Sequence, residues 1–367
     1  MARRADPAET RPPRYSGAGR EAGPYRGRVL TPPDGLSERV LTSALARGWD
    51  ADMSSLAYRA VGFGSHHWEA ADAAGARWFV TVDELQTKQG SLDEPLAAAF
   101  GRQRASLWAA RDLRDCGAAF VVAPVLTRAG EPLARLDDRL TVALYPFVDG
   151  QSFTWGEFAT PEQRSGLLEL VVGVHTAPAA ARRHAATDDF TVLHRDELEL
   201  ALNSGPEATG VADCGPYARP AARLVAEHAA GLRRALARYD ELAAAARSRS
   251  SGRVLTHGEP HPGNVMLTAS GWVLIDWDTV LVAPPERDLW SLDPGDGSVL
   301  RRYADATGVT PRPSLLELYR LRWDLADIAV TISRFRRPHP GSEDDEKSWG
   351  VLRPLVAQWS GDRAPEG

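Results

Sequence analysis

The fold of this chain is indicated most strongly by two stretches of sequence, His257-Gly258-Glu259-Pro260-His261-Pro262-Gly263-Asn264 and Leu274-Ile275-Asp276-Trp277-Asp278. Glu259 and Asn264 lie five residues apart, and Asp276 follows Asn264 by twelve residues, directly after a short apolar run. Magnesium binds hard oxygen ligands and leaves several positions to water and phosphate, so one amide oxygen and one carboxylate suffice as protein ligands. The spacing therefore predicts that Asn264 and Asp276 bind magnesium beside the carboxylate of Glu259.

This segment resembles the catalytic loop and the metal loop of the aminoglycoside phosphotransferase family, a branch of the protein-kinase-like fold. That family usually has His-Gly-Asp at the position of His257-Gly258-Glu259. The resemblance implies ATP and Mg2+ as cofactors, with Glu259 orienting the acceptor hydroxyl or accepting its proton. It also implies that His257 supports the loop through hydrogen bonds. The extra methylene of Glu259 leaves a second interpretation open, in which the chain is a catalytically impaired relative.

Bulk composition excludes several classes of protein. The chain has 367 residues, of which 43% are hydrophobic, enough for one large domain or two coupled domains. A net charge of −6 argues against a nucleic-acid partner, since a protein that binds the phosphate backbone carries a basic surface. The two cysteines are too few for a disulfide framework, and no apolar run is long enough to span a membrane. We therefore expect a cytoplasmic protein without a membrane partner.

The resemblance implies an N-terminal nucleotide-gripping lobe, which we expect over residues 28–148 from the pattern of strands and helices. Residues 1–27 are rich in Arg, Pro and Gly and are expected to form a disordered arm. The expected lobe is a small antiparallel sheet of five strands with one main helix. Strands are predicted at residues 55–61, 68–71, 77–85, 118–126 and 140–147, and helices at residues 36–47 and 95–115.

A larger, mostly helical catalytic and substrate lobe is expected over residues 149–360, followed by a tail at residues 361–367. Thr160 is a predicted helix N-cap, because Pro161 follows it and Gln163 stands three residues after it. Other elements are predicted as helices over residues 220–245 and 314–335 and as short strands at 253–256 and 272–275. This pattern indicates the bilobal α+β protein-kinase-like fold that the family resemblance implies.

The sequence Gly62-Phe63-Gly64-Ser65 resembles the nucleotide-covering loop that the family has between its first two strands. Glycines in such a loop allow backbone amides to approach phosphate oxygens. The resemblance also implies that the hinge between the lobes contacts the adenine. This implication assigns Tyr145 and Phe147 to nucleotide binding.

The third predicted strand lacks the lysine with which the family holds the α- and β-phosphates, and the matching position in the sequence is assigned to Thr81. Lys88 follows Thr81 by seven residues, about 20 Å along an extended strand, so we expect it to be too distant to substitute. His66, His67 and Arg77 are the other candidates for the missing positive charge. The loss of this lysine, together with Glu259, favours the interpretation as a catalytically impaired protein.

Asp324 and Asp327 stand three residues apart and therefore share one face of the predicted helix over 314–335. Residues 319–324 and 275–278 resemble the spectinomycin phosphotransferase-like branch of the family. In relatives that phosphorylate cationic antibiotics, the corresponding helix lines an acidic substrate pocket. The alternative is an exposed, solvated helix face. By the same resemblance, Arg287 and Asp288 have a structural role in anchoring the metal loop.

The function implied is transfer of the γ-phosphate of ATP to a hydroxyl of a small polar molecule that is aminoglycoside-like or an aminocyclitol. Two alternatives stay open. One is a kinase-like binding protein with impaired catalysis, and the other is a metabolic kinase of a sugar or an amino-alcohol. An acidic pocket at Asp324 and Asp327 favours a cationic acceptor, but it does not separate an antibiotic from an amino-alcohol.

Overall fold

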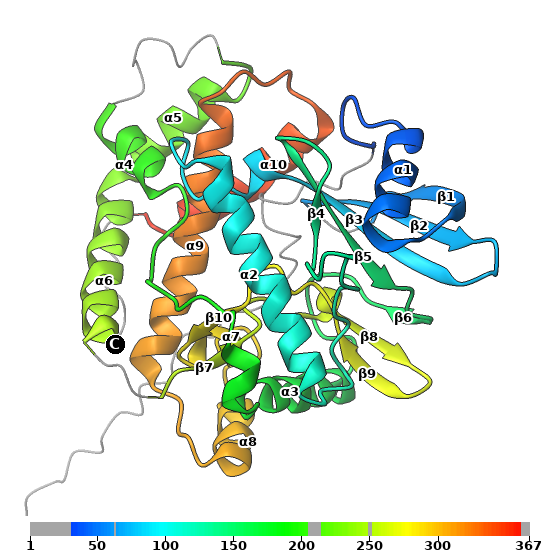
Figure 1. Ribbon diagram of the computed structural model, residues 1–367. Helices are drawn as coiled ribbons and strands as arrows, with labels where there is room; N and C mark the ends of the chain where they lie inside the picture. Colours follow the sequence, from blue (N-terminus) through cyan, green and yellow to red (C-terminus); the bar gives the residue numbers. More distant parts are fainter. Residues whose placement is uncertain (1–30, 62–63, 205–213, 249–251, 361–367) are drawn as a thin grey trace, which may run out of the picture.

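The computed structural model describes residues 31–61, 64–204, 214–248 and 252–360, which form two lobes (Figure 1). The predicted arm at residues 1–27, the tail at 361–367 and the pair Gly62 and Phe63 lie outside these described residues. The first lobe is a five-stranded antiparallel sheet with the strand order β1-β2-β3-β5-β4. Its strands are β1 (Met53–Arg59), β2 (His66–Asp72), β3 (Arg77–Glu84), β4 (Ala134–Arg135) and β5 (Leu140–Pro146).

Alternating side chains of this sheet face two different helices. Val80 and Val82 of β3 are fully buried and pack with Leu41 and Leu45 of α1 (Glu38–Trp49). The opposite face of β5 packs on α2 (Leu96–Asp115), where Ala143 contacts the Leu107 cluster. Because strand side chains alternate between faces, Thr81 and Asp83 point to the same side as α2. The face of β3 that looks toward the second lobe is therefore the polar one.

The predicted strand at residues 118–126 is wrong, and the fifth strand of the sheet is the short β4 instead. Residues 120–122 of this segment lie along Leu274 of the second lobe, whereas Val125 N donates to Leu144 O of β5 at 2.7 Å. Val122 N donates to Leu274 O at 3.1 Å, and Leu274 N donates to Phe120 O at 2.8 Å. The apolar side chains that suggested a strand are buried in the core of the second lobe, where Val121 packs with the C-terminal half of α2.

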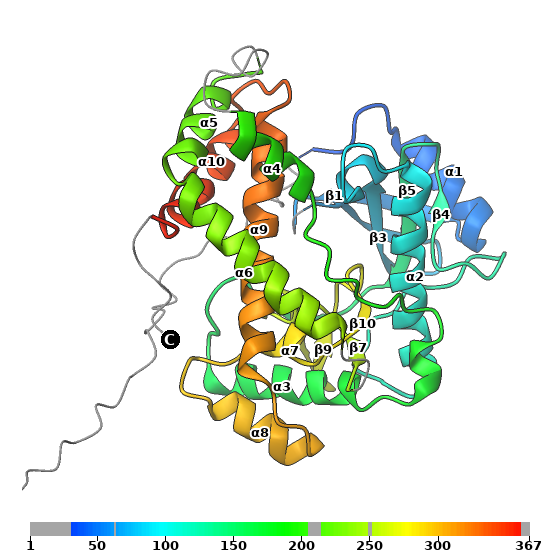
Figure 2. The same cartoon turned by 90° about the vertical axis from the view of Figure 1, so that its left-hand side faces the viewer.

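The second lobe is mostly helical (Figure 2), as the sequence predicted. Thr160 caps α3 by accepting a hydrogen bond from Gln163 N. The single helix predicted over 220–245 is wrong, because it is interrupted at His228, whose φ of −109° and ψ of 11° are not helical. The helices are α3 (Pro161–His175), α4 (Arg195–Ser204), α5 (Ala218–Glu227), α6 (Ala229–Arg247), α7 (Glu286–Leu289), α8 (Ser298–Thr307), α9 (Pro313–Phe335) and α10 (Glu343–Ala357).

Short strands of the second lobe frame the predicted catalytic loop. The pair β7 (Val254–Thr256) and β10 (Leu281–Ala283) precedes and follows it, and β8 (Val265–Thr268) forms a hairpin with β9 (Gly271–Leu274). The first lobe joins this region through β6 (Gly150–Ser152), which pairs with β8. Among the described residues, no helix is both long enough and apolar enough to cross a membrane.

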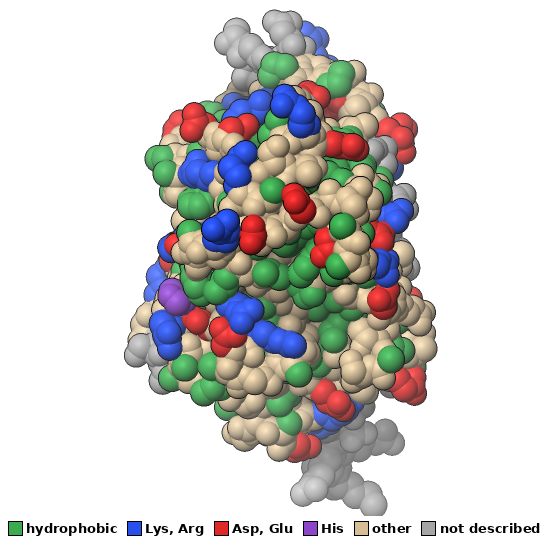
Figure 3. Space-filling view, turned by 45° about the vertical axis from the view of Figure 1, so that its right-hand side comes forward, with side chains coloured by type: hydrophobic (Ala, Val, Ile, Leu, Met, Phe, Trp, Pro, Cys, Tyr) green, Lys and Arg blue, Asp and Glu red, His purple; other side chains and the backbone are tan. Residues whose placement is uncertain are grey.

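The surface in Figure 3 carries acidic and basic side chains that are intermingled over both lobes. Hydrophobic side chains gather between them near the middle of this face. Charges of both signs are thus mixed on this face, and no single acidic patch gathers there.

Candidate active site

The loop that carries Glu259 leaves β7 through a backbone turn that only glycine adopts easily. Gly258 has a φ of +102°, and a Cβ at this position would lie 2.4 Å from the guanidinium of Arg287. Arg287 is held there because it donates to Thr256 Oγ1 at 2.8 Å and to Thr279 O at 2.7 Å. The Gly at this position is therefore required both by its φ and by the close approach of Arg287.

Asp288 anchors the same loop from the start of α7. Its carboxylate is fully buried and accepts hydrogen bonds from His257 N at 2.8 Å and from Gly258 N at 2.7 Å. The same carboxylate lies 3.0 Å from His175 Nε2 of α3. These contacts confirm the prediction that Arg287 and Asp288 have a structural role.

His257 connects the two loops that carry the predicted site residues. Its ring is fully buried, with Nε2 2.9 Å from Ile275 O and Nδ1 3.3 Å from Glu259 N. Since Ile275 O can only accept and Glu259 N can only donate, Nε2 carries the proton and Nδ1 is the acceptor. Burial lowers the pKa of His257, which keeps this neutral form. The predicted supporting role of His257 is thereby confirmed.

Glu259, Asn264 and Asp276 lie in two loops that hydrogen bonds hold together. Asn264, in the 3-10 turn η3 (Pro262–Asn264), donates from Nδ2 to Glu259 O at 2.9 Å. Ile275 N donates to Asn264 O at 2.9 Å, which places Asp276 directly beside the asparagine. The Glu259 carboxylate is half-buried and lies 4.0 Å from His261 Nε2. The sequence spacing therefore brings these three side chains into one region.

The donor set of this region fits a hard cation that completes its shell with phosphate and water. The amide nitrogen of Asn264 is used by Glu259 O, which leaves the oxygen Oδ1 to face a ligand. Asp276 is exposed and has a φ of +65°, a strained backbone conformation for a residue other than glycine. In the described residues, no group of three or more His, Cys, Asp or Glu side chains is arranged to hold a metal. A magnesium site here would thus rely on Asn264, Asp276 and a phosphate-bearing ligand.

Lys88 lies in this region, and the prediction that it is too distant was wrong. Strand β3 ends at Glu84, and the 3-10 turn η1 (Leu85–Lys88) reverses the chain, so the seven residues after Thr81 do not run on as an extended strand. Lys88 Nζ lies 2.8 Å from Asp278 Oδ2 and 3.0 Å from Asp83 Oδ1. The lysine therefore joins the sheet lobe to the loop that carries Asp276.

The β3 side chain that meets α2 is that of Asp83, and Thr81 has a different partner. Asp83 Oδ2 accepts from Gln103 Nε2 of α2 at 2.5 Å, and Gln103 Oε1 accepts from Thr141 Oγ1 at 3.0 Å. Thr81 Oγ1 lies 3.3 Å from His67 Nδ1 on the neighbouring strand. On β3, Asp83 is therefore the side chain that meets helix α2, and the match of Thr81 to the family's lysine stays a sequence prediction.

The other cations considered from the sequence are engaged elsewhere. His66 lies on the α1 side of the sheet, where its Nε2 is 3.2 Å from Glu84 Oε1. Burial lowers the pKa of His67 to about 4, so this ring is neutral at pH 7. Arg77 forms ion pairs with Glu69 and Asp149 at 2.7 Å each.

The two predicted adenine contacts flank the hinge. Burial raises the pKa of Tyr145 well above its ordinary value, and the nearby carboxylates of Asp83, Asp276 and Asp278 add to this effect. Its phenol therefore stays protonated and lies in the same region as the predicted metal ligand. The ring of Phe147 is covered by the guanidinium of Arg77 at 3.6 Å.

Ser65, the last residue of the predicted phosphate loop, donates to Asp83 Oδ1 at 2.5 Å and lies 3.4 Å from Lys88 Nζ. Gly64 has a φ of +75°, which suits a glycine turn. The loop thus ends beside the lysine.

The two acidic residues proposed for the acceptor pocket differ in their surroundings. Asp324 is 6% exposed, and its Oδ2 accepts from Gln358 Nε2 at 3.2 Å. Asp327 is half-buried, and its backbone oxygen accepts from Thr331 Oγ1. Asp324 is therefore part of the packing between α9 and the end of α10, and it does not lie on an exposed helix face.

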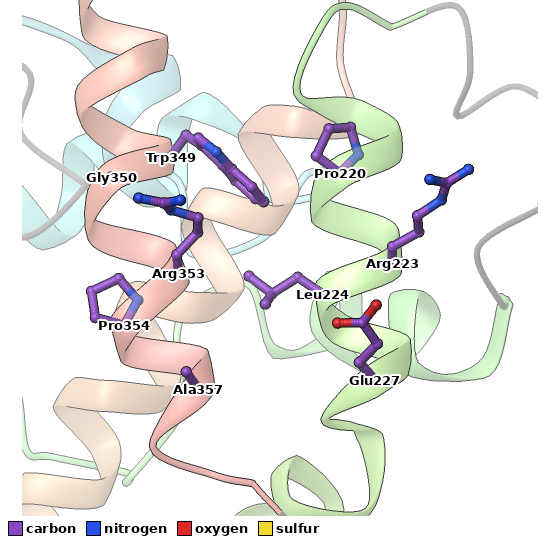
Figure 4. A pocket seen from close by; sticks show the side chains of 9 residues that line it. All are labelled: Pro220, Arg223, Leu224, Glu227, Trp349, Gly350, Arg353, Pro354 and Ala357. Atoms are coloured by element: carbon purple, nitrogen blue, oxygen red, sulfur yellow. The ribbon is translucent and has the colours of Figure 1, made fainter.

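A groove of about 690 Å³ lies elsewhere, between α5 and α10 (Figure 4). Trp349 and Arg353 of α10 face Leu224 and Glu227 of α5 across it. None of the residues that line this groove belongs to the predicted site.

Comparison with known proteins places most of the chain in one family. A profile described as the phosphotransferase enzyme family matches residues 59–320. Protein StrN of Streptomyces griseus is 34% identical over 248 residues, which cover 65% of this chain and 72% of StrN.

Two solved structures share the fold. A spectinomycin phosphotransferase in complex with ADP and spectinomycin has a TM-score of 0.64 at 17% identity, covering 89% of this chain and 99% of its own. Choline kinase LicA from Streptococcus pneumoniae has a TM-score of 0.54 at 12% identity, covering 88% of this chain and 99% of its own. The predicted bilobal kinase-like architecture is confirmed.

Proposed function

The chain belongs to the phosphotransferase enzyme family, and on this basis we propose that it transfers the γ-phosphate of ATP to a hydroxyl group of a small polar molecule. The observation that carries the proposal is the pair of loops that His257 holds together. The proposal is supported because Glu259, Asn264 and Asp276 lie on these two hydrogen-bonded loops, and phosphoryl transfer uses a carboxylate, an amide oxygen and a second carboxylate.

Each site residue has a defined task in this proposal. Glu259 orients the acceptor hydroxyl and takes its proton, while Asn264 and Asp276 hold Mg2+. When bound, Mg2+ supplies positive charge that offsets the charge of the transferring phosphoryl group. Residues Gly62 to Ser65 cover the phosphates, and the hinge at Tyr145 and Phe147 contacts the adenine.

The longer side chain of Glu259 is compatible with catalysis. One additional methylene shifts the carboxylate by about 1.5 Å, the length of one carbon–carbon bond. Phosphoryl transfer proceeds through a loose transition state, in which positioning and charge stabilisation contribute more than proton abstraction. A pocket shaped around Glu259 can therefore place the acceptor hydroxyl correctly.

The proposed acceptor is an aminocyclitol or an aminoglycoside-like compound. A spectinomycin complex is known for a protein of the same fold, and this chain carries Asp324 and Asp327 on α9, which we propose contribute to binding a cationic acceptor. The choline kinase of the same fold motivates the second candidate, an amino-alcohol acceptor. Both acceptors have a hydroxyl group and a positive charge.

A turnover assay tests the proposal and separates the two acceptor classes. Purified protein is incubated with Mg2+ and ATP against a panel of aminocyclitols, aminoglycosides, amino-sugars and choline, and ADP release is measured. We expect turnover with an aminocyclitol or aminoglycoside and its loss in Glu259→Gln. Turnover with choline alone would favour the amino-alcohol kinase. The absence of ATP binding in the presence of Mg2+ would exclude the kinase function.

A further inference from the structure

We propose that Lys88 is the residue that binds the ATP phosphates, and that this chain carries its phosphate-anchoring lysine on the turn after β3 in place of a lysine within β3. The inference rests on the proposed function, because it concerns how the same site holds its nucleotide. It assigns to Lys88 the task of binding the α- and β-phosphates. Strand β3 itself carries the carboxylate of Asp83, which cannot bind them.

The position of Lys88 is fixed from two sides. Leu85, at the start of η1, is fully buried, and its backbone nitrogen donates to Arg139 O at 2.8 Å. At the other end of the turn, Arg102 Nη2 of α2 donates to Lys88 O at 2.8 Å. With the turn held at both ends, the Lys88 side chain reaches Asp83 of β3, and it is 20% exposed. The side chain is therefore held in position and is partly exposed.

The charged groups around Lys88 are distributed differently over the strand, the helix and the turn than the family resemblance implies. The family resemblance implies a strand lysine that pairs with a glutamate of the following helix. Here Asp83 of β3 supplies the carboxylate, Gln103 of α2 supplies a neutral amide, and the cation comes from η1. Lys88 lies between two carboxylates here, with Asp83 Oδ1 at 3.0 Å and Asp278 Oδ2 at 2.8 Å. The strand thus carries a carboxylate and the turn after it carries the cation.

The surroundings of Lys88 join two loops that we propose hold the phosphates. Ser65, the last residue of the phosphate-covering loop, lies 3.4 Å from its Nζ, and Asp278 lies two residues after the proposed metal ligand Asp276. Lys88 thus stands between the loop proposed to cover the phosphates and the loop proposed to bind their metal. An ammonium group there forms charge-assisted hydrogen bonds with phosphate oxygens.

A binding series with ligands of different phosphate number tests this assignment. Full-length wild type, Lys88→Ala, Lys88→Arg and Lys347→Ala are titrated calorimetrically with adenosine, AMP, ADP and ATP, with and without Mg2+. Lys347 is the matched control, because it is the only other lysine of the chain and pairs with Glu343 on the surface of α10.

We expect Lys88→Ala to weaken ATP and ADP binding by about tenfold to a hundredfold, the loss of one charge-assisted contact, while adenosine binding is unchanged. Lys88→Arg should retain part of the affinity, and Lys347→Ala all of it. An equal loss for adenosine and ATP would show that Lys88 only maintains the structure. Unchanged ATP affinity in Lys88→Ala would refute the assignment while leaving the kinase proposal intact. A wild type that binds none of the nucleotides would overturn both.

A lysine-directed label gives an independent measurement. In an acyl-phosphate derivative of ATP, the lysine amine attacks the acyl carbon, an amide forms, and ATP leaves with release of a proton. We expect mass spectrometry to find Lys88 acylated in a reaction that excess ATP suppresses, and Lys347 acylated regardless of ATP. Labelling of Lys88 that excess ATP does not suppress would contradict the proposal.

Discussion

His257 Nε2 lies 2.9 Å from Ile275 O, and this contact, together with the bond from Ile275 N to Asn264 O, ties the loop of Glu259 to the loop of Asp276. Asp288 stabilises this arrangement, because its carboxylate accepts hydrogen bonds from the backbone amides of His257 and Gly258. The buried carboxylate therefore holds the loop of Glu259 in place through its backbone.

Asp288→Asn should destabilise the protein and reduce its sensitivity to acid. Burial alone raises the pKa of Asp288, but the hydrogen bond from His175 and the charges of His175 and Arg287 leave the pKa below its ordinary value. An aspartate in the unfolded chain titrates near pH 3.9, so the unfolded state binds the proton more readily. The stabilisation is therefore complete above this range and is lost as the pH falls through the lower pKa of the folded state.

Urea unfolding at several pH values measures this effect. We expect Asp288→Asn to lower the free energy of unfolding by about 2–3 kcal/mol at pH 7 and to flatten its decline below about pH 4. Asp138→Asn is the control, since Asp138 is exposed. An equal acid dependence in wild type and Asp288→Asn would contradict the assignment.

Gly258→Ala should lower the free energy of unfolding by more than the backbone strain of a positive φ would lower it. The new Cβ would lie 2.4 Å from Arg287, whereas Gly252 has a φ of +82° and no atom near its Cβ position. Gly252→Ala therefore isolates the backbone cost, about 1–2 kcal/mol, and Gly258→Ala should exceed it by about 1–3 kcal/mol of overpacking. Thermal or urea unfolding of both variants gives the comparison. Equal losses would show that Arg287 moves aside at no cost.

Glu259→Asp tests whether the acceptor pocket is shaped around the longer carboxylate. The substitution restores the residue usual in the family but withdraws the carboxylate by about 1.5 Å. We expect kcat with the accepted substrate to fall by about a hundredfold, because misplacement of about 1 Å has this effect, while ATP affinity stays unchanged. Steady-state kinetics and calorimetry measure the two quantities. A faster Glu259→Asp enzyme would mean that Glu259 is a weakened base.

Local sequence patterns were sufficient for the catalytic loop and for most elements. The spacing of Glu259 and Asn264 predicted their proximity correctly, because a short loop between two strands fixes it. The strand over 118–126 failed because apolar side chains do not tell which of two cores buries them. Lys88 was misplaced because its distance was measured along a straight strand, although the chain turns at Leu85.

The partnership of Asp83 with Gln103 could not be predicted, since it joins residues from a strand and a helix across the sheet face. The composition of the chain did, however, point to Lys88. With two lysines in the whole chain, one of them just after the third strand, Lys88 was the natural candidate for a phosphate-binding cation.

Returning the lysine to β3 provides the last prediction. In the triple variant Asp83→Lys, Gln103→Glu and Lys88→Ala, the strand again carries the cation and the helix the carboxylate. Since Asp83 and Gln103 already contact each other at 2.5 Å, the new pair can form in place. We expect ATP affinity to return to within about tenfold of wild type, from the loss seen in Lys88→Ala.

Calorimetry with ATP measures the recovery, and Asp83→Ala with Lys88→Ala is the control that lacks the cation altogether. The control should bind ATP no more tightly than Lys88→Ala, because neither strand nor turn then offers an ammonium group to the phosphates. A folded triple variant that binds ATP as weakly as this control would show that the two positions are not equivalent. Recovery of the ATP affinity would show that the positive charge of the phosphate site can come either from β3 or from η1.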